Sequence, residues 1–201
     1  MPRLEFHFDF GSPNAYLAHR VIPAIAARTG AAFTYVPVLL GGVFKLTNNQ
    51  PPMMQFKGIQ NKAEYARAET ARFIKRHGLT AFCPNPHFPV NTIQIMRGAV
   101  LAEREGFFEH YVETVFRAMW EEGKKMDDPA AIKTTLTDAG LDADRVMEGI
   151  QEQSIKDKLM SNTEASVTRG NFGSPTFFVG DEMFFGKDRL DEVEREIFEA
   201  R

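Results

Sequence analysis

The stretch Phe8-Asp-Phe-Gly-Ser-Pro-Asn-Ala-Tyr16 decides how this chain begins to fold. Residues 4–10 have the length and the alternating phenylalanines of a buried strand, and the pattern from Pro13 onward is helical. Ser is a preferred N-cap residue and Pro is favoured at the first helical position, so Ser12 and Pro13 mark the helix start. The Ser12 hydroxyl therefore stands at a helix N-terminus, where the helix dipole favours an anion.

A strand, a helix and a second strand alternate at the start of the chain. Apolar residues recur at helical spacing over residues 14–28, and Gly30 follows as a stop signal. Residues 32–38 alternate and are rich in Phe, Tyr and Val, as is typical of a strand. This order predicts a parallel βαβ unit with a right-handed crossover.

The strand signal then disappears until residue 175. Residues 41–52 have the Gly, Asn and Pro content of a loop, and the chain from there to about residue 164 is mainly helical in pattern. Strands return at 175–179 and 182–185, and a two-residue turn joins them before an amphipathic helix over 188–201.

This pattern predicts an α/β fold in which one domain is split by a large α-helical insertion. Residues 1–45 and 165–201 make the discontinuous domain, and residues 46–164 make the helical insertion domain. We find no internal repeat, low-complexity tract or flexible linker between them.

A second informative segment lies near the other end of the chain, in Asn171-Phe-Gly-Ser-Pro-Thr-Phe-Phe-Val179. Ser174-Pro175 stands just before an apolar strand, which suits a cis-proline turn because X-Pro bonds take the cis form at modest cost. A tight turn without further role is the alternative, since Gly and Pro end elements in every fold.

Together the two segments resemble the glutathione-using branch of the DsbA-like thioredoxin superfamily, namely kappa-class glutathione transferases and 2-hydroxychromene-2-carboxylate isomerases. The run Gly180-Asp-Glu-Met-Phe-Phe-Gly-Lys-Asp-Arg-Leu190 is most similar to the isomerases. The resemblance covers nearly the whole chain and implies a thioredoxin-like domain in which the cis-proline turn lies against the helix that starts near residue 12. A thiol oxidoreductase would carry cysteines at 12 and 15, but this chain has Ser12 and Ala15, so dithiol exchange is impossible there.

The resemblance also implies a glutathione site. Ser12 would donate a hydrogen bond to the glutathione thiolate, and the Ser174-Pro175 main chain would pair with the cysteinyl backbone. The remaining positions implied to hold glutathione or substrate are Asn49, Lys62, Lys187 and Asp188, the last two at the γ-glutamyl end. Relatives often have Ser or Asn where this chain has Lys187, so Asp188 is the firmer member of that pair.

Each of these positions also has an ordinary structural interpretation. Ser12 has the residue type of a plain helix cap, and no base that would make it a nucleophile is evident nearby. Asn49 and Lys62 suit an exposed loop and an exposed helix face. Lys187 and Asp188 suit the start of the last helix, with the lysine in solvent. Phe82 and Phe88 are candidates to wall an aromatic-substrate pocket.

Composition narrows the function classes. A hydrophobic fraction of 43% and a charged fraction of 25% are those of a soluble globule, and a net charge of −3 does not attract nucleic acid. The one cysteine, Cys83, excludes an internal disulfide, and the histidines lack metal-ligand spacing, so we expect no metal. We see no secretory signal and no stretch that could span a bilayer, and therefore expect a cytoplasmic protein without membrane contact.

The resemblance implies a glutathione-dependent isomerase, interconverting 2-hydroxychromene-2-carboxylate and trans-o-hydroxybenzylidenepyruvate in the breakdown of naphthalene-like aromatics. Glutathione would be its cofactor, a small aromatic carboxylate its substrate, and a homodimer its assembly. Two alternatives stay open, a kappa-type glutathione transferase and a DsbA-like binding protein without redox activity.

Overall fold

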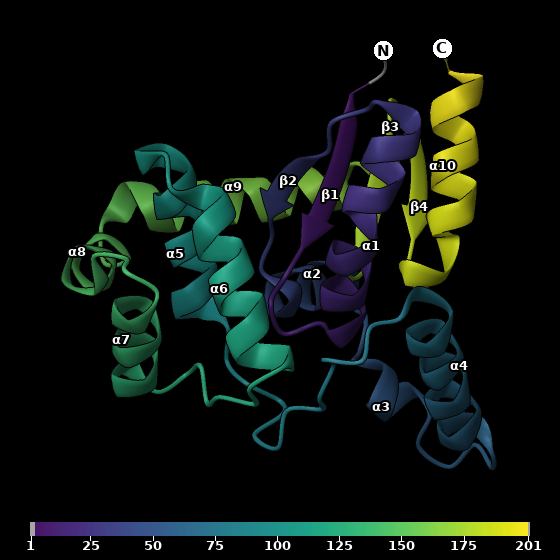
Figure 1. Cartoon of the computed structure of the whole chain (residues 1–201), viewed down its shortest axis with the longest axis horizontal. Helices are drawn as coiled ribbons and strands as arrows, with labels where there is room; N and C mark the ends of the chain where they lie inside the picture. The colour runs from purple at the N-terminus through teal and green to yellow at the C-terminus, as the bar shows by residue number, and fades with distance from the viewer. Residues whose placement is uncertain (1–2, 201) are drawn as a thin grey trace.

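The computed structural model describes residues 3–200, and a four-stranded sheet lies at its centre (Figure 1). The strands β1 (Leu4–Phe8), β2 (Thr34–Pro37), β3 (Thr176–Val179) and β4 (Glu182–Phe185) lie in the order β2-β1-β3-β4. β1 is parallel to β2 and antiparallel to β3, which is antiparallel to β4. The predicted βαβ start and the closing hairpin are confirmed, although β1 is shorter than predicted and leaves Asp9 and Phe10 in the turn that follows.

The described helices are, in chain order, α1 (Pro13–Thr29), α2 (Leu40–Thr47), α3 (Pro52–Gln55), α4 (Lys62–His77), α5 (Ile93–Glu105), α6 (Phe108–Trp120), α7 (Pro129–Asp138), α8 (Ala143–Gly149), α9 (Gln153–Thr168), the 3-10 turn η1 (Lys187–Arg189) and α10 (Leu190–Glu199). The predicted helical character of the long middle segment is confirmed. The assignment of residues 46–164 to a separate insertion domain stays a prediction, and α9 runs across its proposed C-terminal boundary.

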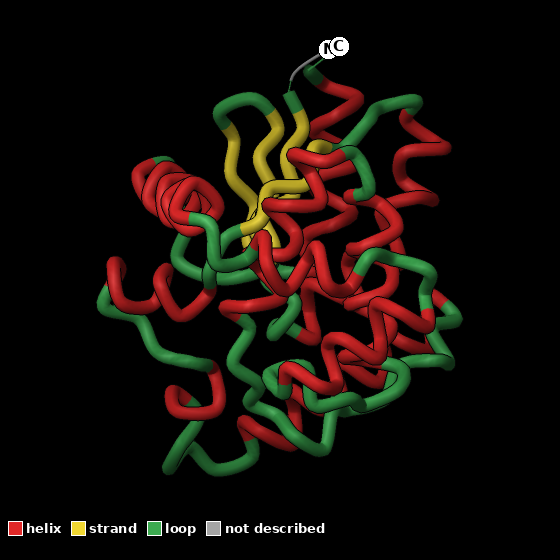
Figure 2. The backbone as a smooth tube through the Cα atoms, turned by 90° about the vertical axis from the view of Figure 1, so that its left-hand side faces the viewer, coloured by secondary structure: helices red, strands yellow, loops and turns green. Residues whose placement is uncertain are grey.

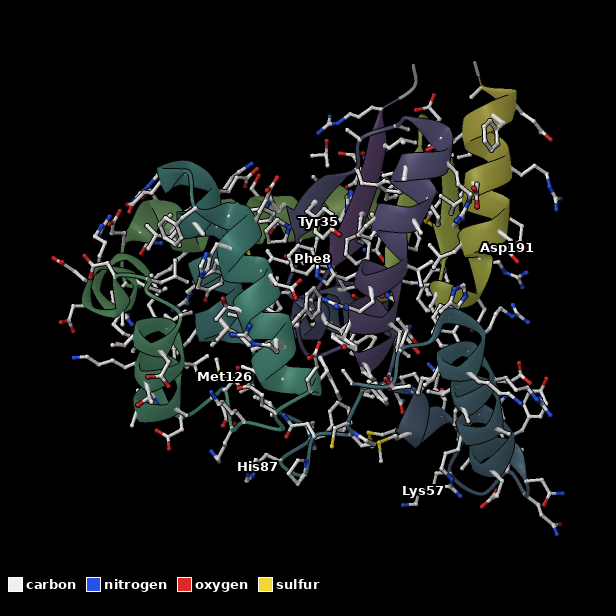
Figure 3. All side chains as sticks on the ribbon, in the orientation of Figure 1. Phe8, Tyr35, Lys57, His87, Met126 and Asp191 are labelled. Atoms are coloured by element: carbon white, nitrogen blue, oxygen red, sulfur yellow. The ribbon has the colours of Figure 1, made fainter. Side chains whose placement is uncertain are left out.

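Helices cover both faces of the sheet, so that the strands form a middle layer (Figure 2). Side chains alternate between the faces of a strand. In β1, Phe6 and Phe8 are fully buried, and their rings stack at 5.5 Å between centroids. Phe8 lies 5.6 Å from Phe116 of α6, and Phe8 and Tyr35 lie in the layer between the sheet and α6 (Figure 3). The alternate residues Glu5 and His7 face α9 and are also buried.

α6 has a buried face that packs against the rings of Phe8 and Phe10. Its members Tyr111, Val112, Val115, Phe116, Met119 and Trp120 are all buried. The indole nitrogen of Trp120 donates a hydrogen bond of 2.7 Å to the carbonyl of Phe10, in the turn between β1 and α1. One core therefore spans both segments and holds the turn that carries Ser12.

The prediction of a loop over residues 41–52 is wrong in its first half, because residues 40–47 form α2. Val43 of α2 is buried, and the amide of Leu39 donates to Thr163 Oγ1 of α9 at 2.9 Å. A Cβ on Gly42 would lie 3.2 Å from Thr163 Cγ2, so the absence of a side chain lets α2 approach α9 closely. Packing against α9 outweighs the low helix propensity of the two glycines.

We predict that Gly98→Ala in α5 destabilises the protein. A Cβ there would lie 2.0 Å from the Tyr111 hydroxyl oxygen, and Tyr111 is fully buried with its hydroxyl donating to Ile95 O at 3.0 Å. Because that ring has no room to move, overpacking should lower the free energy of unfolding by about 1–3 kcal/mol in denaturant titrations. Gly41→Ala is the matched control, since nothing lies within 4 Å of its Cβ and alanine favours the helix. Equal stability of the two variants would contradict this account of the core.

Candidate functional site

Ser12 is the N-cap of α1 and is buried beside the proline turn. Its hydroxyl oxygen accepts a hydrogen bond of 3.1 Å from the amide of Ala15, which is the cap interaction considered above. Its hydroxyl hydrogen is donated to the carbonyl oxygen of Ser174 at 2.8 Å. Ser12 thus has both roles available, as a helix cap and as a contact between two chain segments 162 residues apart.

Ser174 and Pro175 lie against the N-terminus of α1, and the peptide bond between them is cis. The amide of Asp9 donates to Ser174 Oγ at 3.1 Å, and the amide of Gly186 donates to the carbonyl of Pro175 at 2.9 Å. No hydrogen bond of the Ser174 amide occurs within residues 3–200. The segment therefore presents one free N–H beside the Ser12 hydroxyl, at the position expected to pair with a peptide-like ligand.

Asn49 is brought to this segment from the end of α2. Its side-chain amide donates a hydrogen bond of 2.8 Å to the carbonyl of Phe172, just before the cis bond. Its oxygen accepts from the amide of Gln50 and from the side chain of Gln55. Asn49 therefore holds the proline turn in place, a role that the alternative of a plain exposed loop does not include.

Lys187 and Asp188 lie in η1, directly after β4. The interpretation of Lys187 as a solvent lysine is wrong, because it is only 3% exposed and its ammonium lies 5.1 Å from the centre of the Phe73 ring of α4. The ammonium donates to Asp188 Oδ1 at 2.8 Å, while the Asp188 side chain is 65% exposed. The buried cation thus orients an exposed carboxylate that can receive an ammonium from a ligand.

Lys62 is not joined to the other candidates by any described contact. It begins α4, is exposed, and places its ammonium 5.3 Å from the Phe56 ring. Figure 3 shows the neighbouring Lys57 on the outer side of the α3–α4 segment. The structure therefore brings Ser12, Asn49, Ser174 and Pro175 together, places Lys187 beside Asp188, and leaves Lys62 on the surface.

Aromatic rings from the middle segment stand next to the first turn of α1. Tyr16 of α1 stacks on Phe82 at 5.9 Å between centroids, and Trp120 lies 6.1 Å from Phe82 and 6.0 Å from Phe88. Tyr16 also donates to Glu121 Oε1 at 2.8 Å. Burial is the larger cause, and the hydrogen bond to Glu121 the next, of a raised pKa of the Tyr16 hydroxyl. The two phenylalanines considered for an aromatic pocket therefore belong to one cluster that reaches α1.

A buried network behind the proline turn was not foreseen from the sequence. His7 Nδ1 lies 2.7 Å from Ser166 Oγ, which accepts from Asn171 Nδ2 at 2.7 Å. The oxygen of Asn171 accepts from the amide of Gly173 and the hydroxyl of Thr176. Asn171, which is fully buried, thus shapes the loop that carries Ser174. The sequence signal for this network is His7, a polar residue between two phenylalanines.

Asp9 is a second buried residue that sequence reasoning left without a role, and it precedes Ser12 by three positions. Its carboxyl group accepts from the amides of Gly11 at 2.8 Å and Leu40 at 2.7 Å. Burial raises the pKa of this carboxyl group, while the hydrogen bonds from Leu40, Gly11 and the Thr92 side chain oppose the rise. The signal available in the sequence was one acidic residue between two phenylalanines.

A cavity of about 260 Å³ lies on the α9 side of the sheet, lined by residues that include Glu5, His7, Ser166 and Arg169. It contains none of the predicted site residues, so it is separate from the Ser12 turn. Within residues 3–200, none of the helices has the length and apolar character needed to cross a membrane.

The arrangement around Ser12 suits recognition of an anion attached to a peptide-like group. The N-terminus of α1 favours negative charge, the Ser12 hydroxyl is a donor, and the Ser174 main chain offers peptide hydrogen bonds. Since position 15 is alanine and position 12 serine, a thiol at this site would have to come from a ligand.

We predict that His7 makes the stability of the protein depend on pH. Burial lowers the pKa of His7 from 6.5 to about 4, so between these values the unfolded chain binds a proton that the folded chain does not. Stability should therefore fall as pH is lowered from 6.5 to about 4. His7→Asn, whose amide can still reach Ser166, should show a smaller fall in melting temperature over this window.

The control for this experiment is His110→Asn, which changes an exposed histidine of α6. Its melting temperature should follow the pH dependence of the wild type. If His7→Asn also follows the wild type, the buried imidazole is not the titrating group.

Known proteins of similar sequence indicate which family the chain belongs to. The family model for a DSBA-like thioredoxin domain matches residues 3–198. The chain is 27% identical over 191 residues to a 2-hydroxychromene-2-carboxylate isomerase of Sphingobium xenophagum, covering 95% of each protein. It is 25% identical over 201 residues to glutathione S-transferase kappa 1 of Rattus norvegicus, covering 94% of this chain and 87% of the relative.

Solved structures agree with these relatives. A 2-hydroxychromene-2-carboxylate isomerase has a TM-score of 0.83 and 26% identity, with 98% of this chain and 95% of that chain covered. A probable DsbA oxidoreductase from Streptomyces coelicolor has a TM-score of 0.74 at 17% identity, with 100% and 92% covered, which shows the fold alone. The expected thioredoxin-like fold is thereby confirmed, and the relatives support an enzyme of the isomerase or glutathione transferase kind at family level. This chain belongs to the family of DSBA-like thioredoxin domains.

Proposed function

We propose that this protein is a glutathione-dependent isomerase that interconverts 2-hydroxychromene-2-carboxylate and trans-o-hydroxybenzylidenepyruvate. The observation that carries the proposal is the Ser12 hydroxyl at the N-terminus of α1, directed at the carbonyl of Ser174 before the cis bond. Relatives named as this isomerase align over 95% of the chain, which supports the same reaction class here.

The residues present fit glutathione by their donor and acceptor chemistry. A cysteinyl backbone needs both a donor and an acceptor, and Ser174 has a free amide and a carbonyl oxygen with a second lone pair. The γ-glutamyl ammonium needs a carboxylate, and Asp188 presents one that Lys187 holds in place. We therefore assign the main chain of Ser174-Pro175 to the cysteinyl part and Asp188 to the γ-glutamyl part. Asn49 supports the turn, and Lys62 stays a surface candidate for substrate or cofactor.

Ser12 would favour the ionised form of the thiol. A free cysteine thiol has a pKa of about 8.5, so little of it is thiolate at neutral pH. The positive end of the α1 dipole and a charge-assisted hydrogen bond from Ser12 both favour the anion. The Ser174 carbonyl competes for the same hydroxyl hydrogen, and rotation of the hydroxyl would redirect it.

Bound glutathione would supply the nucleophile, a thiolate that adds to the unsaturated pyruvyl side chain and leaves again after bond rotation. The chain's own residues would position the reactants. The aromatic cluster of Tyr16, Phe82, Phe88 and Trp120 supplies apolar surface next to α1 for the substrate ring. The cytoplasm, where glutathione keeps thiols reduced, is the compartment that suits this chemistry.

A kappa-type glutathione transferase is the second candidate, and it is favoured by the relatives of that name at 25% and 26% identity. The same site would serve it, but glutathione would be consumed.

We predict that Ser12→Ala keeps the fold and lowers turnover with glutathione by at least about tenfold, a loss of roughly 1.4 kcal/mol from the transition state. The physical reason is that a hydrogen bond to a charged group contributes about 1.5–3 kcal/mol. The pH–rate profile should move to higher pH, because the thiol pKa would rise towards its free value. Turnover and its pH dependence are measured in one assay of hydroxychromene carboxylate with glutathione.

The control for helix capping is Asp128→Ala. Asp128 caps α7 by accepting from the amide of Ala130 at 2.9 Å, so its removal also costs a cap. That variant should lose comparable stability and keep its activity. If Ser12→Ala keeps both rate and pH profile, Ser12 is a helix cap without a role in the reaction.

We predict further that reduced glutathione stays constant through many turnovers and that the product has the mass of the substrate. An isomerase regenerates its thiol, whereas a transferase consumes one glutathione for each product molecule. A small thiol should restore little activity, since it offers no groups for Asp188 or the Ser174 main chain to position. Mass spectrometry of one reaction mixture measures both quantities, and a conjugate formed in proportion to turnover would establish the transferase instead.

A further inference from the structure

Asp9 is a fully buried carboxylate at the end of β1, in the turn that leads to Ser12. Its Oδ1 accepts from the amide of Gly11 at 2.8 Å, and its Oδ2 accepts from the amide of Leu40 at 2.7 Å. The Thr92 side chain lies against the same turn and opposes the rise of the Asp9 pKa. Both carboxylate oxygens therefore accept a hydrogen bond from a main-chain amide.

The residues around the Asp9 carboxyl group belong to three separate segments near the proposed site. Gly11 is in the Ser12 turn, Leu40 begins α2, and Thr92 precedes α5. A Cβ on Gly11 would lie 3.0 Å from Thr92 Cγ2 and 3.3 Å from Asp9 Oδ1, so the turn is packed closely against both residues.

The main chain of Asp9 makes the remaining connections. Its amide donates to Ser174 Oγ at 3.1 Å, and its carbonyl accepts from the amide of Ser12 at 3.0 Å. One residue thus contacts the Ser12 turn, the proline turn, α2 and the start of α5. Thr92 makes no side-chain cap bond to α5, and its side chain lies against the turn between Asp9 and Gly11.

Burying a carboxyl group costs desolvation free energy, and the hydrogen bonds from its donors must offset that cost. Stability alone is therefore a weak reason for a buried aspartate here. Replacing it by an amide would place an NH₂ group against a backbone N–H, since Gly11 and Leu40 can only donate. The Ser12 turn or the start of α2 would then have to move.

We propose that Asp9 is a positioning residue that sets the location of the Ser12 hydroxyl for the proposed glutathione site. The expected effect of Asp9 on turnover rests on the proposed function. Asp9 acts through Ser12, so its loss and the loss of the Ser12 hydroxyl should not accumulate.

The test is a double-mutant cycle with Asp9→Asn and Ser12→Ala. Asp9→Asn should lower kcat by at least about tenfold and raise the thiol pKa of bound glutathione, as Ser12→Ala does. The double variant should be within about twofold of Ser12→Ala alone, because coupled residues are not additive. Losses that multiply would overturn the inference, and so would a fall in the thiol pKa, which would mean that the charge of Asp9 acts directly on the sulfur.

Thr92→Val gives a milder version if Asp9→Asn does not fold. It removes the hydroxyl that lies near Asp9 and leaves the two backbone donors, and it should lower kcat about threefold with the same upward change of the thiol pKa. Asp128→Asn is the matched control, because it makes the same chemical change at an exposed cap of α7 and should leave kcat and thiol pKa unchanged.

Amide hydrogen exchange separates a failure of this inference from a failure of the proposed function. In the absence of glutathione, the amides of Gly11, Ser12 and Leu40 should exchange faster in Asp9→Asn, or in Thr92→Val, than in Asp128→Asn. If exchange is faster but no variant or wild type uses glutathione, the proposed function is wrong and the structural role of Asp9 stands. If exchange at these amides is unchanged, Asp9 does not hold the turn.

Discussion

The site depends on the pairing of β1 with β2 on one side and β3 on the other. Because β3 is antiparallel to β1, the residues just after β1 lie beside the residues just before β3. Asp9 and Ser12 therefore meet Ser174, although 162 residues separate the two serines. Closing a loop of that length costs conformational entropy, and the buried phenylalanine layer of β1 and β3 offsets it. The contact between Ser12 and Ser174 follows from this pairing.

Polar groups buried on both sides of the proline turn then determine its shape. Asn171 and Ser166 hold it from the α9 side, and Asp9 holds it from the side of the Ser12 turn. Such groups cost desolvation energy, and each is stabilising only while its hydrogen bonds are made. In return the network fixes the geometry, since a loop whose polar groups are all hydrogen-bonded has few alternative conformations. His7 is the exception, because its Nε2 makes no hydrogen bond within residues 3–200, and burial lowers the pKa of the ring to about 4.

The same thioredoxin-like frame supports different chemistry in this family because function resides in a few residues grafted on the fold. DsbA-type neighbours share the arrangement of strands and helices at low identity. In this chain the turn carries serine and alanine, so the redox reaction is lost while the helix N-terminus and the proline turn remain. The middle helices contribute through Trp120, which bonds to Phe10, and through Thr92, which reaches Asp9.

Local sequence determined the elements whose signals are short in range. Ser12-Pro13 as a helix start and the hairpin at 180–181 depend on residues near one another, and both are present. The position of Asn49 beside Phe172 and the burial of Lys187 against Phe73 could not be predicted, because each depends on a partner far away in the chain. α2 was missed for the same reason, since packing on α9 decides its conformation.

Asp9 shows most clearly what the sequence determines and what the tertiary structure decides. The sequence by itself determined that an acidic residue stands between two phenylalanines next to a helix start. Only the tertiary structure decided that its oxygens accept from Gly11 and Leu40 next to Thr92, because these three residues belong to segments that only the folded core brings together. Hydrogen bonds and burial act over a few ångströms, whereas a sequence pattern reports neighbours along the chain. The sequence therefore determined the fold and the residue types of the site, and tertiary packing decided which of them touch.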